Sequence, residues 1–325
     1  MDGLLALAAT NLVSPIILSF VLGVAAALAR SDLSFPEAVA KGMSIYLLFA
    51  IGFKGGAGVA ANGLELKLIL TLLAGAVLSF GLPFLAFLLL GLMTKLDTVE
   101  KAAVAAHYGS ISIVTFVAAT SVLEGQGIPG EGYMVAAAAI MEAPAILSAL
   151  FLVARAGGVS TRDPALLREV MLNGSIVLLV GSFLIGAVTG EEGLSKIKPF
   201  IVDPFQGVLC LFLLDMGLIA GRGLRQAAGD LGAGAIAFGI VMPPIGASFG
   251  LLFAVLIGLS AGGTALLMTL AASASYIAVP AAMRVALPEA RPSVYLTLSL
   301  GVTFPFNLTI GIPLYVAIAN MLQGG

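Results

Sequence analysis

The stretch Ala271-Ala272-Ser273-Ala274-Ser275-Tyr276-Ile277-Ala278-Val279-Pro280 lies within a long apolar segment but departs from the pattern of a continuous helix. Small and hydroxyl-bearing residues come first, β-branched residues follow, and Pro280 lacks an N–H group and clashes with the preceding turn. Inside a bilayer, irregular backbone is tolerated only where it is buried in protein or lines a wet cavity. The stretch therefore predicts a broken transmembrane helix and, at the break, a candidate binding site.

The composition around this stretch is that of a membrane protein. Of the 325 residues, 60% are hydrophobic and 10% are charged, whereas soluble domains carry about 25% charged residues. The net charge of −2 gives no polybasic surface for nucleic acid. Cys210 is the only cysteine, which excludes an internal disulfide. We expect an all-α, polytopic membrane protein that contacts lipid and does not bind nucleic acid.

A second stretch repeats the pattern upstream. Tyr108-Gly109-Ser110-Ile111-Ser112-Ile113-Val114-Thr115-Phe116 carries the same small-Ser-x-Ser order, and an offset of 163 places Ser110 on Ser273 and Ser112 on Ser275. Small residues also allow close packing of helices. Broken segments at matching positions of two halves, however, are the best sequence indication of a transporter's substrate site. The matched pair favours a site.

The apolar segments divide the chain into two halves of five spans each. The expected spans are 12–29, 37–52, 67–93, 97–122 and 131–154, then 170–189, 202–220, 230–258, 261–286 and 292–321. Because five is odd, the halves enter the membrane in opposite directions, as in many secondary transporters. We expect ten transmembrane helices as a five-plus-five inverted repeat, with the first repeat at 1–156, a cytoplasmic linker at 157–169 and the second repeat at 170–325.

The orientation follows from the positively charged loop residues. Loops after the odd-numbered spans hold ten Lys and Arg residues, and loops on the other side hold four. Since Lys and Arg concentrate on the cytoplasmic side, both termini are predicted to lie outside the cytoplasm. The predicted location is the inner (plasma) membrane.

The two breaks offer the groups that an anion needs. A half-helix N-terminus exposes unpaired N–H groups and the positive end of a helix dipole, so two such ends at the bilayer midplane favour a small anion. Serine and threonine hydroxyls add donors without adding charge. The predicted substrate-binding residues are Gly109, Ser110, Ile111, Ser112 and Thr115 in the first break, and Ala272, Ser273, Ala274, Ser275 and Tyr276 in the second.

A cation site is predicted beside the anion site. Glu142 is an ionisable residue deep in an apolar span, which marks it as a cation ligand or proton carrier, although a buried structural partner is the alternative. The predicted cation-binding residues are Ser110, Ser112, Glu142, Ser273, Thr303 and Asn307, with Na⁺ itself expected at Glu142, Ser112 and Thr303. Thr303 and Asn307 could equally satisfy backbone groups freed by Pro305.

Three other polar residues have two interpretations each. His107 precedes the first break, where a hydrogen-bonded structural role is favoured over proton coupling. Asp215 is buried in an apolar span like Glu142, and it could be functional or pair with a facing helix. Tyr276 could contact substrate or fill space.

Enzymatic functions find little support in the sequence. A Gly-x-x-x-x-Gly-Lys-Ser/Thr phosphate-binding loop is missing, and one histidine with one cysteine gives little material for a metal centre or a catalytic triad. We expect a transporter, not an enzyme, with no cofactor and with Na⁺ as the coupling ion.

Several segments resemble the sodium-dependent bicarbonate transporter family, of the SbtA type. The similar segments are Ala272–Arg284 and Thr303-Phe304-Pro305-Phe306-Asn307, and Met141-Glu142-Ala143-Pro144-Ala145 is similar to that family's Met-Asp-x-Pro-Ala. The resemblance implies core and gate domains, and a homotrimer that carries bicarbonate with Na⁺ between two crossing broken helices. It also implies possible regulation by a PII-like protein.

The first break departs from the family pattern. Where the family has Ser-Gly-Ser-Thr, this chain has Ser112-Ile113-Val114-Thr115, which predicts a tighter and less polar pocket. The function expected from the sequence is Na⁺-coupled symport of a small inorganic anion, with bicarbonate first, by alternating access. The alternatives are a symporter or exchanger for another small anion such as a carboxylate, and an anion channel.

Overall fold

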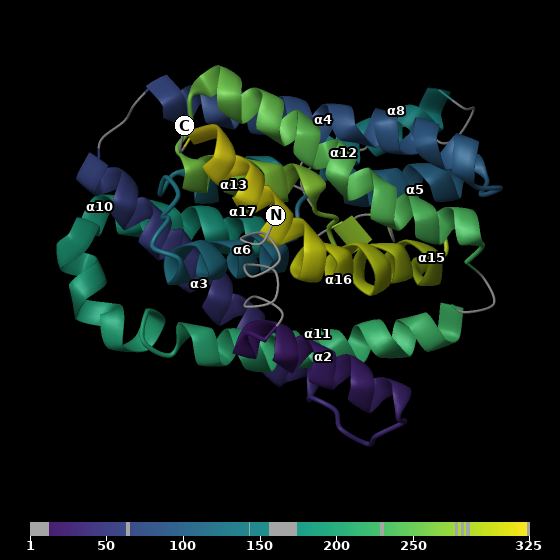
Figure 1. Ribbon diagram of the computed structural model, residues 1–325, viewed down its shortest axis with the longest axis horizontal. Coiled ribbons are helices and arrows are strands. Elements are labelled where there is room, and N and C mark those ends of the chain that lie inside the picture. Colours follow the sequence, from purple (N-terminus) through teal and green to yellow (C-terminus); the bar gives the residue numbers. More distant parts are fainter. Residues whose placement is uncertain are drawn as a thin grey trace.

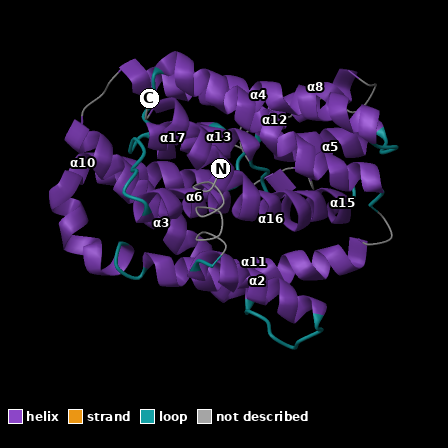
Figure 2. Ribbon diagram, in the orientation of Figure 1, coloured by secondary structure: helices purple, strands orange, loops and turns teal. Residues whose placement is uncertain are grey.

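All regular elements in the described part of the chain are helices, which confirms the all-α prediction (Figure 2). The computed structural model describes residues 13–62, 66–142, 144–155, 174–227, 231–276, 279–280, 283 and 287–323. The helices are α2 (Pro15–Leu28), α3 (Glu37–Asn62), α4 (Leu66–Met93), α5 (Thr98–Gly109), α6 (Ile113–Gly125), α7 (Met134–Ile140), α8 (Pro144–Arg155), α10 (Gly174–Ile201), α11 (Phe205–Ala227), α12 (Ala233–Ile257), α13 (Ala261–Ala272), α15 (Pro292–Leu296), α16 (Phe304–Phe306), α17 (Ile312–Gln323) and the π-helical segments η1 (Thr297–Thr303) and η2 (Asn307–Gly311).

Eight helical segments in the described residues are long and apolar enough to cross a membrane, which supports a multi-pass protein. They are Glu37–Ala61, Leu66–Met93, Thr98–Gly125, Met134–Leu152, Val177–Ile201, Phe205–Arg225, Ala233–Ile257 and Pro292–Leu322. Each overlaps one of the ten expected spans. The other two expected spans contain the shorter apolar helices α2 and α13.

Three predicted span boundaries were wrong. The second span was expected to end at Gly52, but α3 continues through the glycine-rich stretch to Asn62, and α11 runs to Ala227. α10 continues to Ile201 across a bend at Gly190, whose positive φ of 59° suits glycine. In α3 the glycines serve close packing instead of a turn: a Cβ at Gly56 would lie 2.6 Å from the backbone nitrogen of Ala187 on α10.

Four helices form one part of the molecule, which we call the four-helix layer: α2, α3, α10 and α11. Within it α3 packs along α10, α2 packs along α11, and α11 also contacts α3. In Figure 1, α2 and α11 run along the lower edge and α10 along the left, away from α4 and α12 at the top. Gly23 and Gly217 permit the close approach of α2 and α11, since a Cβ at Gly23 would lie 2.9 Å from the nitrogen of Leu218.

The remaining helices form the main body, in which α4 packs on α5, α12 packs on α13, and α4 contacts α12. α8 also packs on α5, and α17 packs on α13. All of the apolar window within Thr98–Gly125 is buried, so α5 and α6 are enclosed by protein. The packing therefore places the first break in the interior of the main body, where irregular backbone is tolerated.

Candidate functional site

The first break separates α5 from α6 at the predicted position. α5 ends at Gly109, and Ser110 and Ser112 have extended backbone conformations before α6 begins at Ile113. Ser112 caps α6, because its Oγ accepts a hydrogen bond of 3.2 Å from the backbone N–H of Thr115. The short hydroxyl residue explains why a new helix starts here. A serine at this place both ends the extended segment and satisfies one orphan donor of α6.

The second break begins at Ser273, where α13 ends. Ser273 has an extended conformation, and its Oγ donates a 2.9 Å hydrogen bond to the carbonyl of Leu270 in the last turn of α13. Ala274, Ser275 and Tyr276 follow as non-helical residues, all buried. Ile277 and Ala278 lie outside the described residues, and Val279 and Pro280 are helical. The chain therefore breaks at both predicted places.

The two breaks contact each other directly. The backbone N–H of Ser112 donates a 3.0 Å hydrogen bond to Ser273 Oγ, and the N–H of Ser275 donates a 2.7 Å bond to the carbonyl of His107. Each extended segment thus satisfies backbone or side-chain groups of the other, across more than 160 residues of sequence. The paired Ser-x-Ser stretches come together in one buried place, as the offset predicted.

Two hydroxyls at the first break have no hydrogen-bond partner within the described structure. They are Ser110 Oγ and Thr115 Oγ1, and both side chains are only 1% exposed. By contrast, the Ser273 hydroxyl both accepts and donates. An unpaired buried polar group costs about 1–3 kcal/mol, so proteins rarely keep one without a use. Ser110 and Thr115 are the hydroxyls best able to bind a ligand.

Gly109 and Ile111 lie at the break in different settings. A Cβ at Gly109 would lie 2.5 Å from Pro83 Cδ and 2.6 Å from the carbonyl oxygen of Ser79, so glycine is needed for α5 to approach α4. Ile111 is buried with 1% of its surface exposed. Ala272 and Ala274 are equally buried. The predicted substrate-binding role of these four residues stays a prediction.

Glu142 lies between α7 and α8, where the fifth span is interrupted at Met141 and Glu142. Its side chain is 4% exposed, and Oε2 has no hydrogen-bond partner in the described structure. The adjacent carbonyl of Met141 accepts a 2.6 Å bond from Ser79 Oγ on α4. The same Ser79 contacts the region of Gly109, so α4 connects the acidic residue to the first break.

Thr303 and Asn307 join helices in this structure. Thr303 Oγ1 donates to the carbonyl of Gly239 at 2.7 Å and lies 2.7 Å from the hydroxyl of Tyr108. Asn307 Nδ2 donates to the carbonyl of Ala272 at 2.9 Å, and its Oδ1 accepts from Tyr315 at 3.0 Å. Within the described residues, no hydrogen bond joins Thr303 or Asn307 to Glu142. The expected Na⁺ site at Glu142, Ser112 and Thr303 stays a prediction.

His107 has the surroundings of a structural histidine. Its Nδ1 lies 2.6 Å from the carbonyl of Ala103, and its ring stacks on Tyr295 with 4.5 Å between ring centroids. Tyr276 packs edge-on against Phe304 with ring centroids 5.5 Å apart, and its buried hydroxyl, like those of Ser110 and Thr115, has no hydrogen-bond partner within the described structure. Contact with substrate and space filling therefore both stay predictions. Asp215 is buried on α11, in the four-helix layer.

Sequence reasoning missed Ser79 and Tyr108 as connecting residues. Both are ordinary members of apolar segments, and their partners Met141 and Thr303 are distant in sequence. The available signal for Ser79 was the nearby Pro83 inside α4, which marks a helix with freed backbone groups.

Comparison with known protein families gives one result that covers nearly the whole chain. Residues 15–320, including both breaks, match the Na⁺-dependent bicarbonate transporter superfamily. The chain belongs to this superfamily. Comparison with curated proteins found no match. Membership confirms the resemblance inferred from the sequence, and the superfamily's description names Na⁺ dependence and bicarbonate transport. A transporter superfamily favours transport over catalysis for this chain.

Proposed function

We propose that the protein is a Na⁺-coupled symporter of a small inorganic anion, with bicarbonate as the first candidate, that works by alternating access. The observation that carries this proposal is the reciprocal contact of the two breaks, from Ser112 to Ser273 and from Ser275 to His107. This contact makes a single buried place to which both halves of the chain contribute.

The first break has donors suited to bicarbonate. In α6 the N–H groups of Ile113 and Val114 have no intrahelical acceptor, because the first four N–H groups of a helix never do. The helix dipole adds a partial positive charge of about +0.5 at this end. Bicarbonate can accept hydrogen bonds from these amides, and its hydroxyl and carboxylate oxygens can pair with the unbonded Ser110 and Thr115 hydroxyls. Nothing charged is needed to bind it.

Glu142 is the proposed ligand of the coupling cation. A buried ionised carboxylate needs a compensating charge, and a cation that enters with the anion supplies one. A role in cation binding stays a prediction for the other five residues, which are Ser110, Ser112, Ser273, Thr303 and Asn307. Because Na⁺ and bicarbonate carry opposite unit charges, their binding together leaves the net charge of the membrane interior unchanged.

Matching contacts in the two halves support an inverted repeat. Asp97 caps α5 by accepting from the N–H of Glu100 at 2.8 Å, and Ser260, 163 residues later, caps α13 by accepting from Gly263 at 3.0 Å. A second pair of contacts shows the same offset of 163. Pro83 of α4 lies against Gly109 in the first half, and Gly246 of α12 lies against Ala272 in the second. We infer repeats at 1–156 and 170–325, with the four-helix layer as the gate domain and the main body as the core domain.

Alternating access would then move the main body relative to the four-helix layer. The homotrimer, the PII-like partner, the plasma-membrane location and the extracytoplasmic termini are proposals that come from the family resemblance and the loop charges.

Uptake of labelled bicarbonate into proteoliposomes tests the proposal. An inward Na⁺ gradient should drive accumulation above equilibrium, and small carboxylates should compete weakly. Accumulation that requires an anion inside the vesicle would indicate an exchanger. Equilibration without a Na⁺ requirement would indicate a channel and would overturn the symport.

A further inference from the structure

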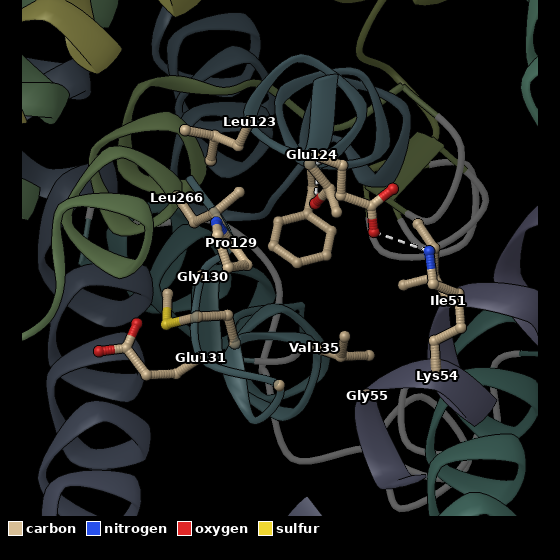
Figure 3. Close-up of a pocket in the computed structure, with 14 residues that line it drawn as sticks. Ile51, Lys54, Gly55, Leu123, Glu124, Pro129, Gly130, Glu131, Val135 and Leu266 are labelled. Carbon is tan, nitrogen blue, oxygen red and sulfur yellow. Dashed lines mark hydrogen bonds and ion pairs between the residues drawn. The ribbon is translucent and has the colours of Figure 1, made fainter. Parts of the chain in front are cut away.

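An ion pair joins the four-helix layer to the main body at the end of α6 that lies away from the break. Lys54 Nζ of α3 lies 2.7 Å from Glu124 Oε1 of α6, and the two side chains point toward one another (Figure 3). The pair of Lys196 and Glu192, by contrast, lies within α10. A movement of the main body relative to the layer therefore acts directly on the pair of Lys54 and Glu124.

The pair can separate at a small cost in free energy. Its side chains are 25% and 42% exposed, so water can replace each partner, and a pocket of about 180 Å³ beside them leaves room for movement. Lys54 has a second partner within its own layer, because Nζ lies 5.5 Å from the centre of the Phe205 ring at the start of α11. Glu124 lies in the last turn of α6, where the helix dipole disfavours a negative charge. Its carboxylate is therefore stabilised by Lys54 and not by its own helix.

The other carboxylate at this pocket makes a contact of a different kind. Glu131, in the loop before α7, accepts a 2.7 Å hydrogen bond from the N–H of Ser260 and a 2.9 Å bond from Ser260 Oγ. Ser260 caps α13, so both partners belong to the main body. The same end of the molecule thus has one polar contact between the two parts and one within a single part.

The inverted repeat gives the ion pair no charged counterpart. At the offset of 163, Lys54 corresponds to Gly217 of α11 and Glu124 corresponds to Leu287, and neither of these residues carries a charge. Two halves with identical contacts would favour neither orientation of an inverted repeat, so contacts that differ between the halves set the balance. An ion pair in one half therefore stabilises the arrangement in which α3 and α6 touch.

We propose that the pair of Lys54 and Glu124 is a conformational latch, which holds the layer against the main body on this side and opens in each transport cycle. By the loop-charge prediction this side faces the outside of the cell, so the latch stabilises the state that is closed to the outside. The inference rests on the proposed alternating-access transport. The alternative is a static contact that stays closed throughout the cycle.

A buried cysteine beside the latch measures its opening without transport. Val135 of α7 is 7% exposed, and a Cβ at Gly55 of α3 would lie 2.9 Å from Val135 Cβ, so α3 covers this side chain. Val135→Cys is made in a Cys210→Ala background, and the purified protein is labelled with the uncharged reagent N-ethylmaleimide. Its local concentration does not depend on the charges of Lys54 and Glu124.

Loss of the latch and a simple change of charge predict different rates. A positive charge favours the reactive thiolate and a negative charge disfavours it, so charge alone would make Lys54→Gln slower and Glu124→Gln faster. Loss of the latch should make both faster, by about two- to fivefold, the range expected for a partly exposed ion pair. The double variant should be no faster than either single variant, and the swap Lys54→Glu with Glu124→Lys should restore the slow rate.

Lys196→Gln is the matched control for these substitutions. Lys196 has the same 2.7 Å contact with Glu192, but this contact lies within one helix of the layer. The substitution should leave the labelling rate of Val135→Cys unchanged.

A reversible cross-link tests whether the opening belongs to transport. In the reconstituted protein, Lys54→Cys and Glu124→Cys are bridged with a short bifunctional methanethiosulfonate. The bridge should stop Na⁺-driven uptake, and a reducing agent should restore it. The control bridge joins Glu131→Cys to Ser260→Cys, and it should leave uptake in place because both ends lie in the main body.

Unchanged labelling rates, or rates that move in opposite directions in the two single variants, would overturn the latch. Uptake that continues in the protein bridged between Lys54→Cys and Glu124→Cys would overturn it as well, and so would an equal loss of uptake with the control bridge. If the Lys54 variants do not fold, the rate in Glu124→Gln and the bridge decide. A wild-type protein that does not transport bicarbonate refutes the proposed function, and the labelling rates with the charge swap then decide the latch by themselves.

Discussion

A substitution of Ser110 should affect ligand binding and protein stability differently, because its hydroxyl is buried without a hydrogen-bond partner in the described structure. Replacing Ser110 with Ala removes a polar group that the folded protein does not use. Most substitutions of a buried polar residue destabilise the protein. Here the expected effect on the ligand-free protein has the opposite sign.

The magnitudes follow from the contacts. An unpaired buried hydroxyl costs about 1–3 kcal/mol, so Ser110→Ala should leave the free protein as stable as the wild type or stabilise it by up to that amount. If the hydroxyl binds bicarbonate, its loss should cost about 0.5–1.5 kcal/mol of binding free energy. That raises the half-saturating bicarbonate concentration by about two- to tenfold.

Ser273→Ala is the matched control. Its hydroxyl accepts from the N–H of Ser112 at 3.0 Å and donates to the carbonyl of Leu270 at 2.9 Å. Removal leaves both backbone groups buried without that partner, which should destabilise the protein by about 1–3 kcal/mol. The two serines have the same chemistry and the same burial, and they differ only in their hydrogen bonds.

Thermal unfolding of the purified proteins without Na⁺ and bicarbonate gives the first comparison, and bicarbonate-dependent uptake in proteoliposomes gives the second. Ser110→Ala should unfold at or above the wild-type temperature and Ser273→Ala below it. The reasoning fails if Ser110→Ala unfolds as early as Ser273→Ala and retains wild-type half-saturation, since the hydroxyl would then be structural.

Three other changes test separate parts of the account. Glu142→Gln should raise the half-saturating Na⁺ concentration by roughly thirtyfold, the equivalent of about 2 kcal/mol for a lost charged ligand, and unchanged Na⁺ dependence would make Glu142 structural. Gly109→Ala should destabilise by about 1–3 kcal/mol through overpacking against α4, whereas Gly81→Ala, which has open space around it, should be neutral or stabilising; equal thermal shifts would contradict the packing argument. In a background without the native cysteine, Glu191→Cys should react with an impermeant thiol reagent on intact cells and Lys95→Cys should not; the reverse pattern would invert the orientation.

The two breaks could be predicted from the sequence because their chemistry is local. Serine side chains compete for backbone hydrogen bonds, and Pro280 cannot continue a helix without strain. The repeat at an offset of 163 then indicated that the breaks belong together. The contacts of Ser112 with Ser273 and of Ser275 with His107 agree with that inference.

The C-terminal boundary of α3 could not be predicted, because glycine occurs both in turns and at places where two helices pack closely. Gly52 and Gly56 occur in a stretch that reads as a turn, yet they allow α3 to contact α10: a Cβ at Gly52 would lie 2.7 Å from the carbonyl of Leu179. Only the partner helix decides between these two cases, and it is more than 120 residues away in sequence.

The roles of Thr303 and Asn307 were also undetermined for a tertiary reason. Their side chains bond the carbonyls of Gly239 and Ala272, which no local pattern connects to them. Thr303 ends the π-helical segment η1 and Asn307 begins η2, and such segments leave no signature in apolar periodicity. Hydroxyl and amide side chains in such places serve equally well as helix connectors or as ion ligands.

The shared anion site is tested most directly by a double-mutant cycle on Na⁺-driven bicarbonate uptake. Thr115→Val removes an unpaired hydroxyl from the first break with little change of shape. Ser275→Ala removes from the second break a hydroxyl that accepts a 3.5 Å hydrogen bond from the N–H of Val279. If both hydroxyls act on one anion, each variant should raise the half-saturating bicarbonate concentration, and the double variant should deviate from additivity by about 0.5 kcal/mol or more. Additive losses, or bicarbonate dependence untouched in all three proteins, would contradict a site shared by the two breaks.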